Sequence, residues 1–210
     1  MEEGWPCGVA IYMLTMTKHS MSLVGIILLA AIAFAVLWSY NLSLQATAQS
    51  LILEVEDLGR TQNRTERFDR LRRRYRQRLR PSDQCTHERC YYKITVTNRV
   101  LAALRITPYT ELKAYFQIRD DNPTGTLLEY RAAFRDGVSP VVHVQDDFYG
   151  GVDFFVNPHD ADGQVVSNGL VMVNTTTNAD QKAYAYALNV NCLTQIGGCR
   201  DGRNLLPGIW

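Results

Sequence analysis

Charge is missing from a long stretch near the N-terminus. No charged or histidine side chain occurs between His19 and Glu54, and residues 21–40 are almost continuously apolar. About 20 apolar residues cross the roughly 30 Å hydrocarbon layer of a bilayer as one helix, because every backbone polar group must pair within the segment. Trp38 and Tyr40 end the run, where aromatic rings favour the headgroup region. We predict an uncleaved transmembrane helix (a signal anchor) at 21–40, with the lipid bilayer as its partner.

A cleaved secretory signal peptide is the alternative interpretation of this segment. Lys18 and His19 form a short basic region, and Ala46-Thr47-Ala48 fits the small-x-small rule for cleavage after Ala48. The apolar run is longer than the 7–15 residues usual for a signal peptide, and the stretch before Ala48 is also long. We therefore favour the anchor.

The flanking charges predict the orientation. Lys18 is the one Lys or Arg close to the N-terminal end, whereas residues 41–57 hold three acids and no base. By the positive-inside rule, residues 1–20 form a cytoplasmic tail and the C-terminal part lies outside the cytoplasm of the cell. The ten arginines from Arg60 to Arg80 pull the other way, so the cysteines decide the orientation.

Cysteines outside the N-terminal tail occur in two short-spaced pairs: Cys85 with Cys90, and Cys192 with Cys199. An even count in close pairs predicts disulfides in an oxidising compartment, although four cysteines allow three pairings. A zinc site that includes His87 is the alternative, but both spacings are wider than the usual zinc knuckle. We favour disulfides.

Residues 41–84 are predicted to form a helical, arginine-rich stalk. The first helix continues to about Leu58, and Asn63 with Glu66 matches a capping box that begins a second helix. That helix carries a narrow apolar stripe (Phe68, Leu71, Tyr75, Leu79) and an arginine face (Arg67, Arg70, Arg74, Arg78). The face is interpreted as a solvated surface, or as a surface for lipid headgroups or another polyanion. Nucleic acid is not expected as a partner, because it would require the cytoplasmic orientation.

From residue 91 onward the apolar period changes from 3.6 to 2. Alternating patterns predict strands near 92–97, 111–119 and 128–135, with further strands at 141–146, 152–156, 170–175 and 182–192. Residues 100–106 fit either a short helix or an irregular edge. The fold class is thus mainly β with N-terminal helices, and residues 85–210 form an antiparallel β-sandwich-like domain. No tryptophan lies between Cys90 and Cys192, so the immunoglobulin signature is absent.

Motifs for catalysis are scarce. The chain has four histidines and contains no H-E-x-x-H, G-x-S-x-G, C-x-x-C or Gly-rich phosphate loop. His143 with Asp146 or Asp147 is a candidate base and orienting acid, but a strand histidine bonded to backbone is the commoner case. We predict no catalytic site; a periplasmic enzyme that uses His143 or the acidic loops is an alternative function.

Acidic residues gather in the predicted loops after residue 145. Carboxylates that converge from loops suit calcium, although acids are also ordinary turn residues. No other cofactor is expected. The candidate calcium ligands are Asp147, Asp153, Asp160 and Asp162.

The order of segments resembles type IV pilins and pseudopilins: a membrane helix, a stalk, an antiparallel sheet and a C-terminal disulfide loop. In that family a Gly-Phe-type processing site and an early glutamate mark the apolar helix. Here His19-Ser20-Met21-Ser22 occupies that place, and no acid precedes Glu54 within the helix. The resemblance implies a pilin-like or pseudopilin-like structural component as an alternative function.

These observations predict a single-pass membrane protein that carries an extracytoplasmic binding or envelope-assembly domain. Its partner would belong to an envelope protein complex. The exposed aromatic residues proposed as contacts are Tyr91, Tyr115 and Tyr149.

Overall fold

The computed structural model describes residues 8–61, 63–81, 85, 89–135, 140–146, 155–156, 168–173 and 178–207. It separates into two compact units, Met1–Ser43 and Leu44–Trp210. Each unit is described by itself.

Helix α1 (Gly8–Arg60) is continuous, which confirms that the apolar helix extends to about Leu58. In the part of α1 that belongs to the first unit, ten large apolar side chains from Leu23 to Trp38 each expose more than half of their surface. The stretch Leu23–Arg60 contains a helix that is long and apolar enough to cross a membrane. The burial pattern changes at Leu44, where the second unit begins.

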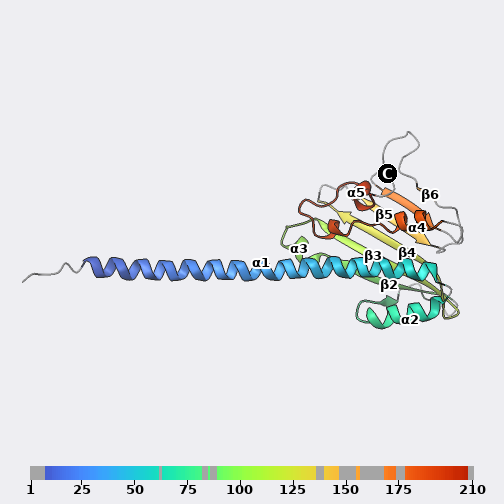
Figure 1. The fold of residues 1–210 in the computed structure, drawn as a ribbon, viewed down its shortest axis with the longest axis horizontal. Coiled ribbons are helices and arrows are strands. Elements are labelled where there is room, and N and C mark those ends of the chain that lie inside the picture. The colour runs from blue at the N-terminus through green and yellow to red at the C-terminus, as the bar shows by residue number, and fades with distance from the viewer. Residues whose placement is uncertain are drawn as a thin grey trace, which may run out of the picture. The chain divides into compact units, whose positions relative to one another are not determined.

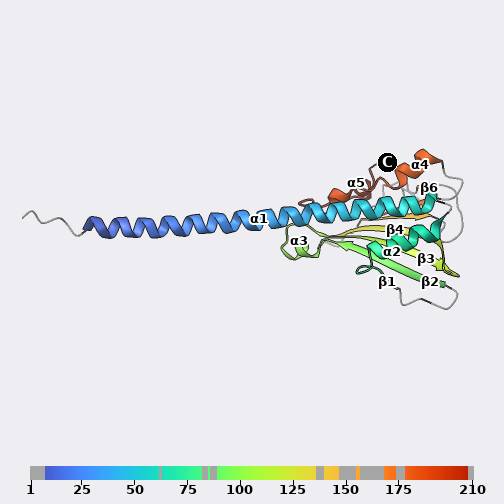
Figure 2. The same cartoon turned by 60° about the horizontal axis from the view of Figure 1, so that its bottom comes forward.

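In the second unit, α1 is a core helix. Its buried side chains recur at helical spacing and form one apolar stripe, and Figures 1 and 2 both show this part of α1 beside the sheet. The stripe consists of Leu44, Ala48, Leu51, Ile52, Val55 and Leu58. Residues 44–60, predicted as part of a stalk, therefore contribute to the hydrophobic core.

The strands form a single seven-stranded sheet in the order β1-β2-β3-β4-β5-β7-β6. Strands β1 (Arg80–Pro81), β2 (Arg89–Thr97), β3 (Tyr109–Arg119), β4 (Asn122–Ala133) and β5 (Val141–Asp146) pair antiparallel in sequence. Strand β7 (Asn168–Val173) pairs parallel with β5, and β6 (Phe155–Val156) pairs antiparallel with β7. The described strands thus form one mixed sheet covered by helices; the second sheet expected for a sandwich is not found among them.

One face of the sheet is the hydrophobic core, as the period-2 pattern predicts. The buried residues alternate along β2 to β5, and cross-strand register places Ile94 opposite Ala114, Ala114 opposite Leu128, and Leu128 opposite Val144. Helix α2 (Arg64–Arg74) covers part of this face through Phe68, whose ring lies 6.0 Å from Tyr92 and 5.4 Å from Phe116.

A two-residue turn joins β3 to β4. Asp120 and Asp121 both have positive φ, 49° and 61°, which is the backbone of a type I′ turn. This turn fits the right-handed twist of the strands that it joins. The register shifts at Gln117/Ile118, so Pro123 is accommodated opposite Ile118 beside this irregularity.

The predicted strand at 182–192 is wrong. This segment contains helix α4 (Ala179–Ala185) and the 3-10 helix η1 (Val190–Leu193). Asn178 and Gln181 form a capping box at the start of α4, and the alanines of this segment favour helix over strand. The other short helices are α3 (Arg99–Ala103), one of the two forms expected for 100–106, and α5 (Gly202–Leu205).

The predicted capping box at Asn63 does not form, although α2 begins at the next residue. Asn63 makes no side-chain bond to a helix N–H; instead its Nδ2 donates to Glu66 Oε2 at 2.8 Å. The helix ends with Tyr75 as its C-cap, so Arg78 and Leu79, which were predicted on this helix, lie beyond it.

Candidate functional site

A groove of about 540 Å³ lies at one end of the sheet. We call it the arginine groove. It is lined by three segments: residues 102–109 between α3 and β3, residues 133–135 at the end of β4, and Gly197 with Arg200 from the C-terminal disulfide loop. Its volume lies in the range of small-molecule sites.

The floor of the groove is apolar and its charges are all positive. Ile106, Pro108 and Phe134 supply the floor, and no acid occurs among the described residues that line it. The arginines of the lining are Arg105, Arg135 and Arg200.

Two of these arginines are held in defined ways. The Arg200 guanidinium carbon lies 4.7 Å from the centre of the Phe134 ring, so the cation stacks on the groove floor. Arg105 has a φ of 59°, a left-handed backbone conformation that is uncommon outside glycine and costs about 1 kcal/mol. The turn after α3 places an arginine where a glycine would be less strained.

Asn98, at the end of β2, braces the segment that forms the groove floor. Its side chain is fully buried and its Nδ2 lies 2.7 Å from Thr107 Oγ1, 2.8 Å from Pro108 O and 2.7 Å from Leu193 O. Its Oδ1 accepts a hydrogen bond from the Thr110 N–H at 2.8 Å. One side chain therefore links the floor segment to η1.

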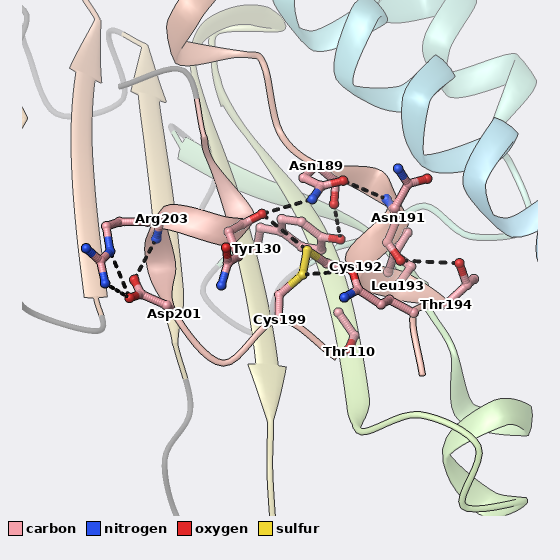
Figure 3. Close-up of a disulfide and its surroundings, with 12 residues drawn as sticks. Thr110, Tyr130, Asn189, Asn191, Cys192, Leu193, Thr194, Cys199, Asp201 and Arg203 are labelled. Carbon is pink, nitrogen blue, oxygen red and sulfur yellow. Dashed lines mark hydrogen bonds and ion pairs between the residues drawn. A yellow bond between two sulfur atoms is a disulfide. The ribbon is translucent and has the colours of Figure 1, made fainter. Parts of the chain in front are cut away.

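The side of the groove that Gly197 and Arg200 line belongs to the loop closed by the disulfide between Cys192 and Cys199. Figure 3 shows this disulfide beside Tyr130. Tyr130 donates from its hydroxyl to Asn189 O at 2.9 Å, which fixes the start of this loop against β4. Gly198 has a φ of 65°, and a Cβ there would lie 2.2 Å from Pro108 Cγ. The loop can approach the floor this closely because residue 198 has no side chain.

The acids next to the groove are engaged by other groups. Asp201 pairs with Arg203, whose N–H and guanidinium both donate to it, and these bonds lower the pKa of Asp201. Glu111 accepts from the Tyr109 hydroxyl at 2.9 Å and pairs with Lys113 at 2.5 Å.

A row of charged side chains crosses the other face of the sheet. Lys113, Glu129 and His143 are register neighbours on β3, β4 and β5. Lys113 Nζ donates to Glu129 Oε1 at 2.9 Å, and His143 Nε2 lies 3.6 Å from Glu129 Oε2. The His143 contact and the Lys113 bond outweigh the effect of burial and lower the pKa of Glu129 to about 2. Burial acts to lower the pKa of Lys113, but its bonds to Glu111 and Glu129 raise it above the ordinary value.

This row corrects the predicted pairing of His143 with Asp146. The two residues are three apart on β5, so their side chains leave opposite faces of the sheet. Asp146 is buried on the helix-covered face, 3.4 Å from the Tyr186 hydroxyl. His143 instead faces Glu129, and no nucleophile is paired with it among the described residues.

Most arginines of the predicted arginine face of α2 lie close to acidic side chains. Arg67 Nη1 lies 2.8 Å from Asp57 Oδ2, Arg74 pairs with Glu54, and Arg70 Nη2 lies 3.7 Å from Glu66 Oε1. Arg78 is exposed beyond the helix. Two of these pairs join α2 to α1, so the face contributes to helix packing. A polyanion surface on this helix stays a prediction.

Other predicted site residues are distributed as follows. Cys85 and Cys90 form the second disulfide, with Cα atoms 4.1 Å apart, so both cysteine pairings are the local ones. Tyr91 and Tyr115 are half-buried on the sheet face that carries the charged row. Outside the described residues lie Tyr149, His87 and the four candidate calcium ligands Asp147, Asp153, Asp160 and Asp162. The part of the chain that is described contains no group of three or more potential metal ligands.

Sequence reasoning missed the arginine groove because its residues come from three separate segments between Ala102 and Arg200 and follow no motif. Two local signals were available. The Gly197-Gly198 pair inside a disulfide loop indicates left-handed backbone, and Phe134 continues the apolar pattern of β4 beyond the end of the strand at Ala133.

Comparison with protein-family models, with curated proteins and with solved structures finds no match for this chain.

Proposed function

We propose that this chain is a single-pass membrane protein whose disulfide-bonded second unit lies outside the cytoplasm and serves as a binding or envelope-assembly domain. The observation that carries the proposal is the set of exposed apolar side chains from Leu23 to Trp38. Transfer of each such side chain from water to an apolar environment is favourable by about 1.5–3 kcal/mol, and the interior of a bilayer is such an environment. The two disulfides support an oxidising location for the second unit.

The packing of α1 supports an anchor over a cleaved signal peptide. Cleavage after Ala48 would cut α1 at a fully buried residue and remove Leu44 from the core. It would also remove Gln45, whose Nε2 donates to Thr194 Oγ1 at 2.6 Å. A cleaved chain would therefore lose part of the helix that covers the sheet.

Thiol counting in intact membranes tests this proposal, and Cys7 supplies an internal control. The chain has five cysteines. Denaturation without reductant should expose one reactive thiol, Cys7, and addition of reductant should expose all five. Labelling of Cys85, Cys90, Cys192 and Cys199 without reductant, or a reporter fused after Trp210 that proves cytosolic, would overturn the proposal. Mass spectrometry of the membrane-extracted chain distinguishes the intact anchor from a product that begins at Gln49.

A pilin-like structural subunit is a second candidate function. The favouring observation is that α1 is one helix whose second half packs on an antiparallel sheet, with a disulfide loop near the C-terminus. This arrangement matches the plan that the order of segments suggested. The match is one of architecture only.

A photoreactive residue separates these two functions. In place of the exposed Leu28 it should crosslink mainly to lipid if the chain is a solitary anchor. A ladder of products at multiples of the chain's own mass would favour the filament subunit. The same probe in place of Ile196, which is 80% exposed in the disulfide loop, serves as the matched control outside the apolar helix.

A further inference from the structure

We propose that the arginine groove binds a small amphiphilic anion: a phosphate or carboxylate group attached to an apolar body. This inference rests on the binding role proposed above and names the class of ligand. Three segments that are distant in sequence each contribute one guanidinium to the same groove, at Arg105, Arg135 and Arg200. Guanidinium groups match the planar oxygen pairs of carboxylates and phosphates better than any other side chain does.

The apolar floor selects against a simple inorganic anion. Ile106, Pro108 and Phe134 line the same groove as the three arginines, and the groove volume of about 540 Å³ exceeds what one phosphate fills. The stacking of Arg200 on Phe134 places a cation directly beside this floor. A ligand with both a charged head and an apolar or aromatic body would use both parts of the site.

The backbone of Arg105 is the second observation that points to a ligand. Strained left-handed residues persist where the surrounding fold holds them, and they concentrate at binding sites. Here the strain places an exposed arginine at the groove, next to Thr107 and Pro108, which Asn98 contacts.

The test uses the full chain in neutral phosphatidylcholine nanodiscs and isothermal titration calorimetry. The probes are 1-naphthyl phosphate and 2-naphthoate, with 1-naphthol and inorganic phosphate as controls that each lack one half of the ligand. Both naphthyl anions should bind, and each control should bind about tenfold more weakly or not at all, because it loses one set of contacts. Equal binding of 1-naphthol, or no binding of either anion, would overturn the proposal.

Matched variants locate the site. Arg135→Gln and Arg105→Gly should each weaken binding about tenfold, since each removes one charge-assisted contact. Glycine at 105 also relaxes the strained backbone, so that variant should fold. Arg131→Gln removes an exposed arginine of the same strand β4 that does not line the groove, and it should leave the affinity unchanged. Equal losses in all three variants would indicate non-specific charge attraction and contradict the inference.

Nanodiscs that contain phosphatidylglycerol distinguish two sources of the anion. If phosphatidylglycerol competes with 1-naphthyl phosphate for the chain, and if this competition disappears in Arg135→Gln, the occupant is a lipid headgroup. If the affinity for 1-naphthyl phosphate is the same in both kinds of nanodisc, the occupant is a soluble molecule. Either result is consistent with a groove that binds an anionic group. The thiol count reports the location of the unit separately, so failure of ligand binding does not depend on failure of the membrane proposal.

Discussion

The Nδ2 atom of Asn98 lies 2.7 Å from the carbonyl oxygen of Leu193, across 95 residues of sequence. This bond joins the end of β2 to η1, where the C-terminal disulfide loop begins. The same nitrogen also lies close to Thr107 and Pro108, so one buried amide links the floor segment of the arginine groove to the start of the disulfide loop.

Asn98→Ala should destabilise the second unit by about 3–5 kcal/mol, because the Thr110 N–H and the Leu193 carbonyl both lose their bond to this buried side chain. Asn204→Ala is the control, since Asn204 is exposed on α5 and its backbone oxygen, not its side chain, bonds to Asn189. The measurement is chemical denaturation of the full chain in detergent micelles. A loss no larger for Asn98→Ala than for Asn204→Ala would contradict the bracing role.

The two adjacent glycines of the disulfide loop give a matched pair. Gly198→Ala should cost about 2–4 kcal/mol and narrow the groove, because its new Cβ meets Pro108 on top of the left-handed strain. Gly197→Ala has a similar φ of 78° but nothing within 4 Å of its Cβ, so about 1 kcal/mol of backbone strain is expected. Thermal unfolding of both variants checks the order; equal effects would mean that the close approach to Pro108 is not a constraint.

Replacing both cysteines of either disulfide by serine should lower stability modestly. The loop-entropy relation gives about 2.5 kcal/mol for the pair at 192 and 199, and about 2 kcal/mol for the pair at 85 and 90. Only the first replacement should also weaken binding of 1-naphthyl phosphate, because only that loop lines the groove. Loss of binding in both double variants would show that the effect is one of general stability.

Acid should remove the contribution of Glu129. Its folded-state pKa of about 2 is lower than the ordinary value of 4.5, so the stabilisation is fully present above about pH 4.5 and is lost as the pH falls toward 2. We expect a loss on the order of 2 kcal/mol across this window, measured by urea unfolding at each pH. Glu129→Gln should be less stable at neutral pH and show a shallower acid dependence. An identical pH profile in this variant would assign the effect to other carboxylates.

The periodic parts of the fold were predictable. Residues 92–96, 112–118 and 128–132 alternate between apolar and polar side chains, and β2, β3 and β4 bury these apolar positions on one face. The part of α1 from residue 21 to about Leu58 followed from the long apolar run and the lack of proline in it, whereas residues 8–20 of the helix had been predicted only as a tail. In both cases the local pattern and the tertiary burial agree.

The errors have local causes. Tyr184, Tyr186, Leu188 and Val190 alternate as in a strand, but the capping box at Asn178 and the alanines that flank the tyrosines favour a helix turn. The stalk was inferred from helical spacing that continues past the apolar run; ion pairs such as Arg67 with Asp57 instead join α1 and α2 in the compact unit. The arginine groove depends on contacts between distant segments, which no spacing in the sequence encodes.

One wall of the groove is closed by a covalent bond that requires an oxidant. Without the bond between Cys192 and Cys199, Gly197 and Arg200 would be held at the groove by non-covalent contacts alone. Under the extracytoplasmic location proposed above, this side of the groove would be completed only after export, so that anions of similar chemistry inside the cell would meet an unfinished site.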